Sequence, residues 1–168
     1  MAQVLSPLET LAVLVPVLVA NGSPVLLAKG TPIDFGRRLW DGRRVLGDGK
    51  TFEGYLVGSL YGTSVGLFLL SLLGLPEADV APLLVAVNAG LLGDIVAAFF
   101  KRRAGLERGE PAPILDQLDF YAGALLALAL LGYVCDPTVV LVLAPLIYFL
   151  HRGTNIAAYR LGLKKEPW

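Results

Sequence analysis

The sequence has a single cysteine, no excess of charge of either sign, and no basic residue among its first 28 positions. Cys135 therefore cannot form a disulfide within the chain. The 14 basic and 14 acidic residues cancel, so the net charge by itself identifies no partner. No Lys or Arg precedes the first apolar stretch, which carries Glu9 instead. That stretch does not have the form of a cleavable signal peptide, and we expect it to remain in the mature protein.

Apolar residues dominate what is present. They make up 55% of the 168 residues, and the mean hydropathy is +0.67, whereas soluble domains are roughly 45–50% apolar. Apolar stretches cover approximately residues 8–27, 54–75, 80–100, 118–134 and 138–159. Each is close to the ~17–25 residues that a helix needs to span a bilayer. We predict an all-α polytopic membrane protein with five transmembrane helices, formed by one domain of residues 1–168.

The basic residues predict the orientation. All 14 lie in three places: the loop after the first stretch, the loop after the third, and the C-terminal end. The N-terminal segment and the short turns around residues 77–79 and 135–137 have none. The positive-inside rule then places the N-terminus outside and both long loops in the cytoplasm, where they would form the active face of a cell-membrane protein. The structural alternative is that these charges are topology signals and lipid-headgroup anchors, which explains the asymmetry without any catalysis.

Three aspartates, Asp94, Asp116 and Asp119, lie inside or at the mouth of these apolar stretches. An ionisable group at membrane depth costs ~2.5–3.5 kcal/mol on insertion scales, so it indicates function by default. The cluster Lys101-Arg102-Arg103 follows Asp94 closely. Carboxylates beside a cationic loop indicate Mg²⁺ and a phosphate substrate, and pairing with nearby Lys or Arg is the structural alternative. Helical spacing places Asp116 on the face of Asp119, and Asp94 in line with Lys101.

The first long loop, residues 31–51, is rich in Gly, Asp and Arg. Glycine backbone amides and Arg or Lys side chains together bind phosphate oxygens, so this loop has the composition of a polyphosphate cradle. Its end, Gly49-Lys50-Thr51, is similar to the end of a P-loop. That motif requires Gly at the position of Arg44 and a preceding strand, so the P-loop interpretation fails. Asp34, Asp41 and Asp48 are explained as turn-forming residues.

Two helical irregularities leave alternatives open. Gly54, Gly58, Gly62 and Gly66 repeat every four residues and form a face that favours close helix packing, either within the chain or in a homodimer. The run from Asn21 to Pro24 breaks the first helix near its inner end. It indicates either a polar pocket or the point where this helix ends in the loop.

The chain resembles the archaeal CDP-archaeol synthases, relatives of the bacterial CDP-diacylglycerol synthases. The resemblance covers nearly the whole chain and keeps the order of the motifs. It depends on Pro32-Ile33-Asp34, the run from Asp41 to Thr51 with Gly54, Gly93-Asp94 with Lys101-Arg102-Arg103, Asp116-Gln117-Leu118-Asp119-Phe120, His151 to Asn155, Gly162-Leu163-Lys164 and Pro167-Trp168. Gln117 stands where the bacterial signature has Arg.

This resemblance implies transfer of CMP from CTP to the phosphate of an isoprenoid ether lipid, with Mg²⁺, giving CDP-archaeol and pyrophosphate. It implies a catalytic set of Lys50, Asp94, Asp116 and Asp119, whose three aspartates would hold the metal. Phosphate contacts are implied for Arg43, Arg44, Lys50, Thr51, Lys101 and Arg102, and further substrate contacts for Asn21, His151 and Asn155. Helix packing is the alternative for His151 and Asn155. The expected partners are CTP, a lipid phosphate and the membrane, with no nucleic acid.

Two rival functions would require sequence features that this chain lacks. A small transporter or ion-conducting protein would distribute polar groups through the membrane thickness, whereas here they gather at one face. A CDP-alcohol phosphotransferase would show an Asp-Gly-x-x-Ala-Arg motif, which Asp41-Gly42-Arg43-Arg44-Val45-Leu46 does not match.

Overall fold

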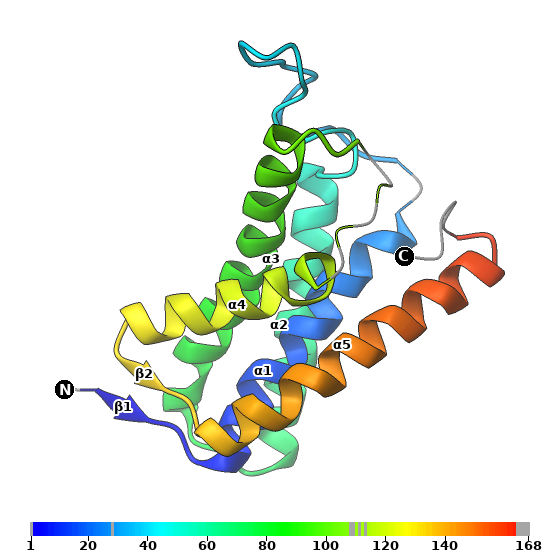
Figure 1. Cartoon of the computed structure of the whole chain (residues 1–168). Coiled ribbons are helices and arrows are strands. Elements are labelled where there is room, and N and C mark those ends of the chain that lie inside the picture. The colour runs from blue at the N-terminus through cyan, green and yellow to red at the C-terminus, as the bar shows by residue number, and fades with distance from the viewer. Residues whose placement is uncertain (1, 28, 108–109, 111, 113, 164–168) are drawn as a thin grey trace.

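The computed structural model describes residues 2–27, 29–107, 110, 112 and 114–163. Arg108 and residues 164–168, which entered the topology and resemblance arguments, lie outside the described residues. The described chain forms five α-helices that match the five predicted stretches (Figure 1). Their bounds are α1 Pro7–Gly22, α2 Phe52–Leu72, α3 Val80–Arg103, α4 Leu115–Leu130 and α5 Pro137–Arg160.

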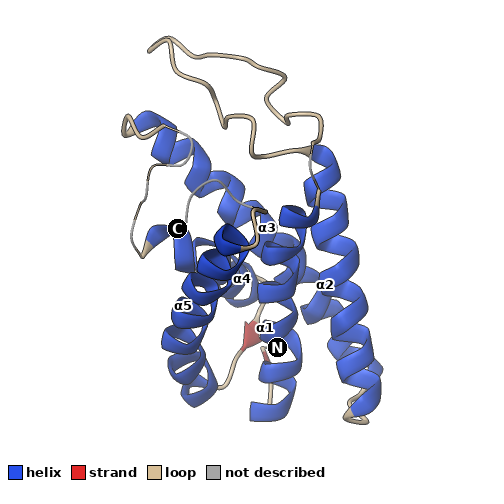
Figure 2. Cartoon of the chain, turned by 90° about the vertical axis from the view of Figure 1, so that its right-hand side faces the viewer, coloured by secondary structure: helices blue, strands red, loops and turns tan. Residues whose placement is uncertain are grey.

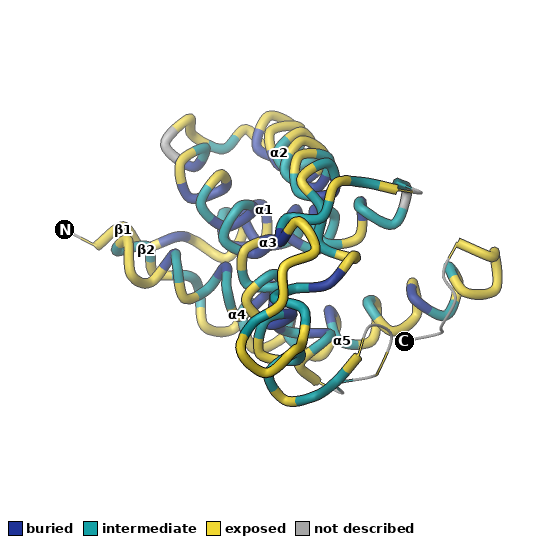
Figure 3. The backbone as a smooth tube through the Cα atoms, turned by 90° about the horizontal axis from the view of Figure 1, so that it is seen from above, coloured by how far each residue is buried: buried dark blue, intermediate teal, exposed yellow. Residues whose placement is uncertain are grey.

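Helix α1 is the centre of the bundle, since it contacts each of the other four α-helices. Its Val13, Leu14 and Val17 are almost fully buried, together with Leu83 of α3 and Phe120 of α4. The outward faces of α2 and α5 are exposed (Figure 3). They are also strongly apolar, with Leu56, Leu60, Phe68, Leu141, Val142 and Phe149 among the exposed side chains. Burial of apolar residues at the centre and apolar exposure outside is the pattern of a bundle that faces lipid.

The glycine face of α2 packs inside the chain. Gly54, Gly58, Gly62 and Gly66 are all buried. A Cβ added to Gly62 would lie 2.7 Å from Cβ of Ala20 in α1, and one added to Gly66 would overlap the side chain of Leu83 in α3. The intramolecular alternative is confirmed. The prediction of a homodimer through this face is wrong, because other helices of the same chain cover the glycines.

The break in α1 is a short extension of the helix. The chain continues from Gly22 into the 3₁₀ helix η1 Ser23–Leu26, which packs against α2. The carbonyl oxygen of Val19 accepts hydrogen bonds from both the backbone amide of Ser23 and, at 2.6 Å, the Ser23 hydroxyl, so the hydrogen bonding of α1 continues into the break. A second 3₁₀ helix, η2 Glu77–Asp79, leads into α3.

Four helical segments among the described residues, those of α1, α2, α3 and α5, are long and apolar enough to cross a bilayer. Helix α4 has 16 residues, which at 1.5 Å per residue is about 24 Å, short of a ~30 Å hydrocarbon core. It also runs steeply across α3 (Figure 1). The structure further contains one element that an all-α prediction omits, a parallel pair of two-residue strands, β1 Gln3–Val4 and β2 Tyr133–Val134.

Candidate active site

The candidate site forms where α3 and α4 touch. Gly93 of α3 and Gly123 of α4 face each other, so that a Cβ on Gly93 would lie 2.7 Å from the Asp119 carbonyl oxygen and 3.0 Å from Cα of Gly123. Only residues without a side chain allow two helix backbones to approach so closely. This contact brings Asp94, which follows Gly93, next to Asp119.

Five charged side chains from three segments gather at this contact, and we call them the lysine–carboxylate cluster: Lys50, Asp94, Lys101, Asp116 and Asp119. The Lys50 ammonium, from the end of the loop before α2, donates to Asp94 of α3. Lys101 of α3 donates to Asp116 of α4. Asp94, Lys50 and Lys101 also act electrostatically on Asp119. The four residues of the implied catalytic set and Lys101 are thereby brought together, although they lie as far as 69 positions apart in the sequence.

Asp119 has the least satisfied side chain in the cluster. It is 8% exposed; its Oδ1 accepts from the backbone amide of Phe120, while its Oδ2 is buried with no hydrogen-bond partner. A buried carboxylate oxygen without a donor is costly. A hard cation is the group that would satisfy it.

The cluster fits a Mg²⁺ ion that also binds a nucleotide. No three or more His, Cys, Asp or Glu side chains of the described residues converge as a closed metal site. Mg²⁺ in nucleotide enzymes, however, is usually held by one or two carboxylates together with substrate phosphates. Asp94 and Asp119 supply two such carboxylates, close enough to act electrostatically on each other. Both oxygens of Asp116 already have hydrogen-bond donors: Lys101 donates to one, and the Ala112 amide donates to the other at 2.8 Å.

The ion pairs differ from those that spacing along one helix indicated. Asp94 pairs with Lys50 rather than with Lys101, although both Asp94 and Lys101 lie on α3. Lys101 lies two turns closer to the cytoplasmic end predicted for α3, where Asp116 at the start of α4 reaches it. The loop delivers Lys50 to Asp94 instead.

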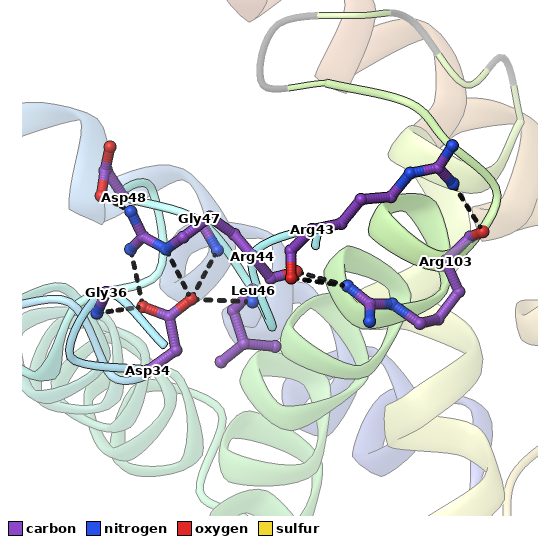
Figure 4. A network of polar contacts seen from close by, with 8 residues as sticks. All are labelled: Asp34, Gly36, Arg43, Arg44, Leu46, Gly47, Asp48 and Arg103. Atoms are coloured by element: carbon purple, nitrogen blue, oxygen red, sulfur yellow. Dashed lines mark hydrogen bonds and ion pairs between the residues drawn. The ribbon is translucent and has the colours of Figure 1, made fainter. Parts of the chain in front are cut away.

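A buried aspartate organises the loop between η1 and α2, which extends beyond the helix ends (Figure 2). The side chain of Asp34 is 1% exposed. Its carboxylate accepts two hydrogen bonds from Arg44, at 2.7 and 3.2 Å, and one from each of three backbone amides, those of Gly36, Leu46 and Gly47 (Figure 4). Burial alone would raise the pKa of Asp34, but these five donors outweigh it and hold the pKa well below its usual range. The prediction of a turn-forming residue understated its role.

Two arginines fasten this loop to the end of α3. The Arg43 guanidinium donates to the Arg103 carbonyl oxygen at 3.1 Å, one of the carbonyls that a helix C-terminus leaves open. Arg103 donates in return to the carbonyl oxygen of Arg44 and, at 3.0 Å, to the Asp41 carboxylate (Figure 4 shows the backbone contacts). These contacts connect the loop to the end of α3, the helix that carries Asp94 and Lys101.

A cavity of about 230 Å³ lies between the loop and the end of α3. We call it the arginine cavity, because its charged lining consists of Arg38, Arg43, Arg44 and Arg102 with Asp48 and Glu107. The predicted site residues thus fall into two groups. Lys50 and Lys101 belong to the lysine–carboxylate cluster, and Arg43, Arg44 and Arg102 line the cavity beside it.

The other predicted residues have local structural contacts as well. The Thr51 hydroxyl accepts the Gly54 amide at 3.0 Å and caps α2, so its predicted phosphate contact would have to coexist with the cap. Asn21 is half-buried in the last turn of α1. On α5, Asn155 is buried, and the His151 ring packs 5.5 Å from that of Phe120, next to Asp119. Substrate contacts for these residues remain predictions.

Three contributions were missed from the sequence: the buried anchor Asp34, the clamp Arg103, and Arg38 in the cavity wall. The signal available for Arg38 was the dipeptide Asp41-Gly42, which favours a hairpin turn. Such a turn pairs Arg38 with Arg44, as the structure does, and both residues line the cavity.

The bundle of apolar helices, with paired lysines and carboxylates at the end that carries the cationic loops, has the features of an intramembrane enzyme that acts on phosphates. A family model described as CarS-like, CDP-archaeol synthase, matches residues 1–168. The chain belongs to this family. Membership also decides between the two classes left open by the sequence, in favour of the enzyme and against the transporter.

Individual relatives agree with this assignment. The chain is 54% identical over 169 residues, covering 100% of both chains, to a protein of Hyperthermus butylicus named CDP-archaeol synthase. It is 46% identical to one of the same name from Aeropyrum pernix, covering 96% of this chain and 92% of the relative. A solved structure described as an intramembrane enzyme for archaeal membrane lipids biosynthesis superposes with a TM-score of 0.81 at 40% identity, covering 92% of this chain and 96% of that one.

Proposed function

We propose that this protein is a Mg²⁺-dependent CDP-archaeol synthase, which transfers CMP from CTP to the phosphate of an isoprenoid ether lipid and releases pyrophosphate. The observation that carries the proposal is the lysine–carboxylate cluster, which lies at the end of the helix bundle where the long loops are. The chain belongs to this family over its whole length. The activity requires a polar site that both a water-soluble nucleotide and a membrane lipid can reach.

The reaction joins two anions. A phosphate oxygen of the lipid forms a bond to the α-phosphorus of CTP, the bond from that phosphorus to the bridging oxygen breaks, and the electron pair leaves with pyrophosphate. Lys50 and Lys101 would screen the repulsion between the lipid phosphate and the nucleotide. No covalent intermediate with the protein is needed, so position and charge supply the catalysis.

Asp94, Asp116 and Asp119 would hold the Mg²⁺. When bound, the ion would neutralise charge on the phosphates of CTP and on the departing pyrophosphate. Lys50 and Lys101, which donate to Asp94 and Asp116 in the structure, would bind phosphate oxygens once substrate is present.

We place the N-terminus outside, α4 as a fifth crossing, and the active face in the cytoplasm. The strand pair supports the return across the membrane: Val4, just before α1, pairs with Val134, just after α4. The chain that enters α4 beside Lys101 therefore leaves it at the level of the N-terminus. All Lys and Arg of the sequence belong to the other side, as the positive-inside rule requires of a cytoplasmic face.

The test is a reconstitution with purified protein, labelled CTP, Mg²⁺ and an isoprenoid ether-lipid phosphate. We expect CDP-lipid and pyrophosphate in equal amounts, and no product when the lipid alcohol without phosphate replaces the substrate. Pyrophosphate release from CTP at the same rate without lipid would contradict a transferase.

A further inference from the structure

We infer that Glu53 is a positioning residue for the transfer: it closes the base of the loop between η1 and α2 and so holds Lys50 where its ammonium reaches Asp94. The inference rests on the proposed function and deepens it, because Lys50 belongs to the implied catalytic set. Glu53 lies outside the predicted site and acts through the backbone that carries this lysine.

The Glu53 carboxylate joins the two ends of the loop. One of its oxygens accepts the backbone amide of Thr31 at 2.6 Å, and the other accepts the Thr31 hydroxyl at 2.8 Å. We call this pair the Glu53–Thr31 clasp. The two residues are 22 positions apart, so the clasp is a tertiary contact, although Glu53 lies in the first turn of α2. Hydrogen bonds to a carboxylate are stronger than those between neutral groups.

The clasp continues into a short antiparallel pairing that includes Lys50. Next to Thr31, Pro32 pairs with Thr51. One residue further on, the Ile33 amide donates to the Lys50 carbonyl oxygen at 2.9 Å. The segment that Glu53 holds at its first residue is therefore the same segment that fixes the backbone of Lys50.

The chain passes the clasp too closely for a side chain at position 30. A Cβ on Gly30 would lie 2.7 Å from the Glu53 carboxylate and 2.8 Å from the Thr51 side chain. Both distances are well inside the ~3.5–4.0 Å of favourable contact between non-bonded carbon atoms. The base of the loop is thus closely packed around Glu53.

Lys50 lies between two anchors of the loop. On one side, the Asp34 carboxylate holds the backbone amides of Leu46 and Gly47; on the other side is the clasp. The lysine side chain is a flexible four-carbon stem, so the place of its ammonium depends on the place of its backbone. A shift of about 1 Å in a reacting group can cost as much as a hundredfold in rate.

The clasp itself is exposed to solvent. Contacts of this kind open locally and contribute little to the stability of a whole bundle. We therefore expect loss of the clasp to displace Lys50 while the helices remain folded, a separation that a general loss of structure would not produce.

The first test measures Lys50 directly and needs no turnover. The purified full-length protein is treated with a limiting amount of acetic anhydride, and modification of each lysine is quantified by mass spectrometry. In Glu53→Ala we expect several-fold more modification of Lys50, because its ammonium is no longer held against Asp94. Lys101, which pairs with Asp116 through helix positions alone, should keep its wild-type reactivity, and the thermal midpoint should not change.

The second test shows whether Glu53 acts through Thr31. Turnover to CDP-lipid should fall roughly ten- to a hundredfold in Glu53→Ala. It should fall less in Thr31→Val, which loses the hydroxyl but keeps the amide contact, and not at all in Thr31→Ser, which keeps both donors. The double variant with Glu53→Ala and Thr31→Val should be no slower than Glu53→Ala alone, because both changes remove the same interaction.

The matched control is Glu9→Ala. Glu9 also lies in the first turn of a helix and also accepts a backbone amide at 2.6 Å, but that amide belongs to Ser6, three residues away. We expect wild-type Lys50 modification and turnover in this variant. Equal effects of Glu9→Ala and Glu53→Ala would reduce the role of Glu53 to that of a negative charge at a helix start and overturn the inference.

Two other results would also overturn it. One is unchanged Lys50 modification in a slow Glu53→Ala enzyme, and the other is additive losses in the double variant. If Glu53→Ala does not fold, Thr31→Val decides by the same measurement of Lys50, since it leaves the carboxylate in place. Failure of the wild type to form any CDP-lipid would instead refute the proposed function, and the modification of Lys50 would still test the clasp.

Discussion

Replacement of Asp34 by Asn should open the loop between η1 and α2 without unfolding the bundle. The carboxylate holds five donors at 2.7–3.2 Å, and two of them come from Arg44. Removal of one partner of a buried ion pair costs ~3–5 kcal/mol. Arg44 is 22% exposed and keeps Asp48, so the lower limit applies, about 3 kcal/mol.

The assay is hydrogen exchange by mass spectrometry on the loop peptide that contains the Leu46 and Gly47 amides. A loss of about 3 kcal/mol corresponds to roughly a hundredfold loss of protection, because 1.36 kcal/mol is a factor of ten. The control is Asp48→Asn. Asp48 binds the same Arg44 but its side chain is 58% exposed, so we expect a loss below ~1 kcal/mol.

The sign of the pH effect follows from the lowered pKa of Asp34. Its contribution is complete above the unfolded pKa of ~3.9 and is lost as pH falls further towards the folded pKa. Protection of the wild-type loop should therefore be constant from neutral pH to about pH 5 and decline only below about pH 4. Unchanged protection in Asp34→Asn, or an equal loss in Asp48→Asn, would refute the anchor.

Three further outcomes are expected. Gly93→Ala should lower the free energy of unfolding by ~1–3 kcal/mol and remove much of the activity, because the added Cβ would overlap the α4 backbone. The control Gly153→Ala, with open space around it, should leave the thermal midpoint unchanged or higher. Equal effects of the two variants would contradict the close helix contact. Burial and nearby Glu9 raise the pKa of Asp79, so ionisation of this carboxyl destabilises the folded wild type. The melting temperature of Asp79→Asn relative to that of the wild type should therefore rise from pH 5 to pH 8. A decrease of this difference with pH would contradict the prediction. Cys135, whose pKa is raised by burial, should react slowly with a membrane-impermeant maleimide, and only from outside; labelling only from the cytoplasmic side would invert the topology.

Much of the fold could be predicted because the local sequence determines where a membrane helix forms. Length and apolar composition located all five α-helices, and the glycine spacing of α2 correctly indicated close packing. The features that could not be predicted are tertiary contacts between distant segments. Nothing local tells that the short α4 crosses α3 steeply, or that Gln3 pairs with Tyr133.

The candidate site divides in the same way. Charges at membrane depth identified Asp94, Asp116 and Asp119 from their cost alone. Their partners could not be inferred, because spacing on one helix says nothing of a lysine that arrives 44 residues earlier in the chain. The same limit concealed the Arg103–Asp41 pair, formed across 62 residues. Turn propensity explained Asp34 only in part, since its five donors depend on the folded loop.

The most direct test of the central claim is the Mg²⁺ dependence of CDP-lipid formation in Asp94→Asn, Asp116→Asn and Asp119→Asn. Asn keeps the shape of the side chain and one acceptor oxygen but removes the charge that a hard dication prefers. The account predicts that each variant remains folded by thermal melting, loses most of its turnover and binds Mn²⁺ more weakly without substrates, whereas Glu77→Gln, at the opposite end of the bundle, behaves as wild type. Near-normal turnover of the three variants at limiting Mg²⁺ would contradict the account.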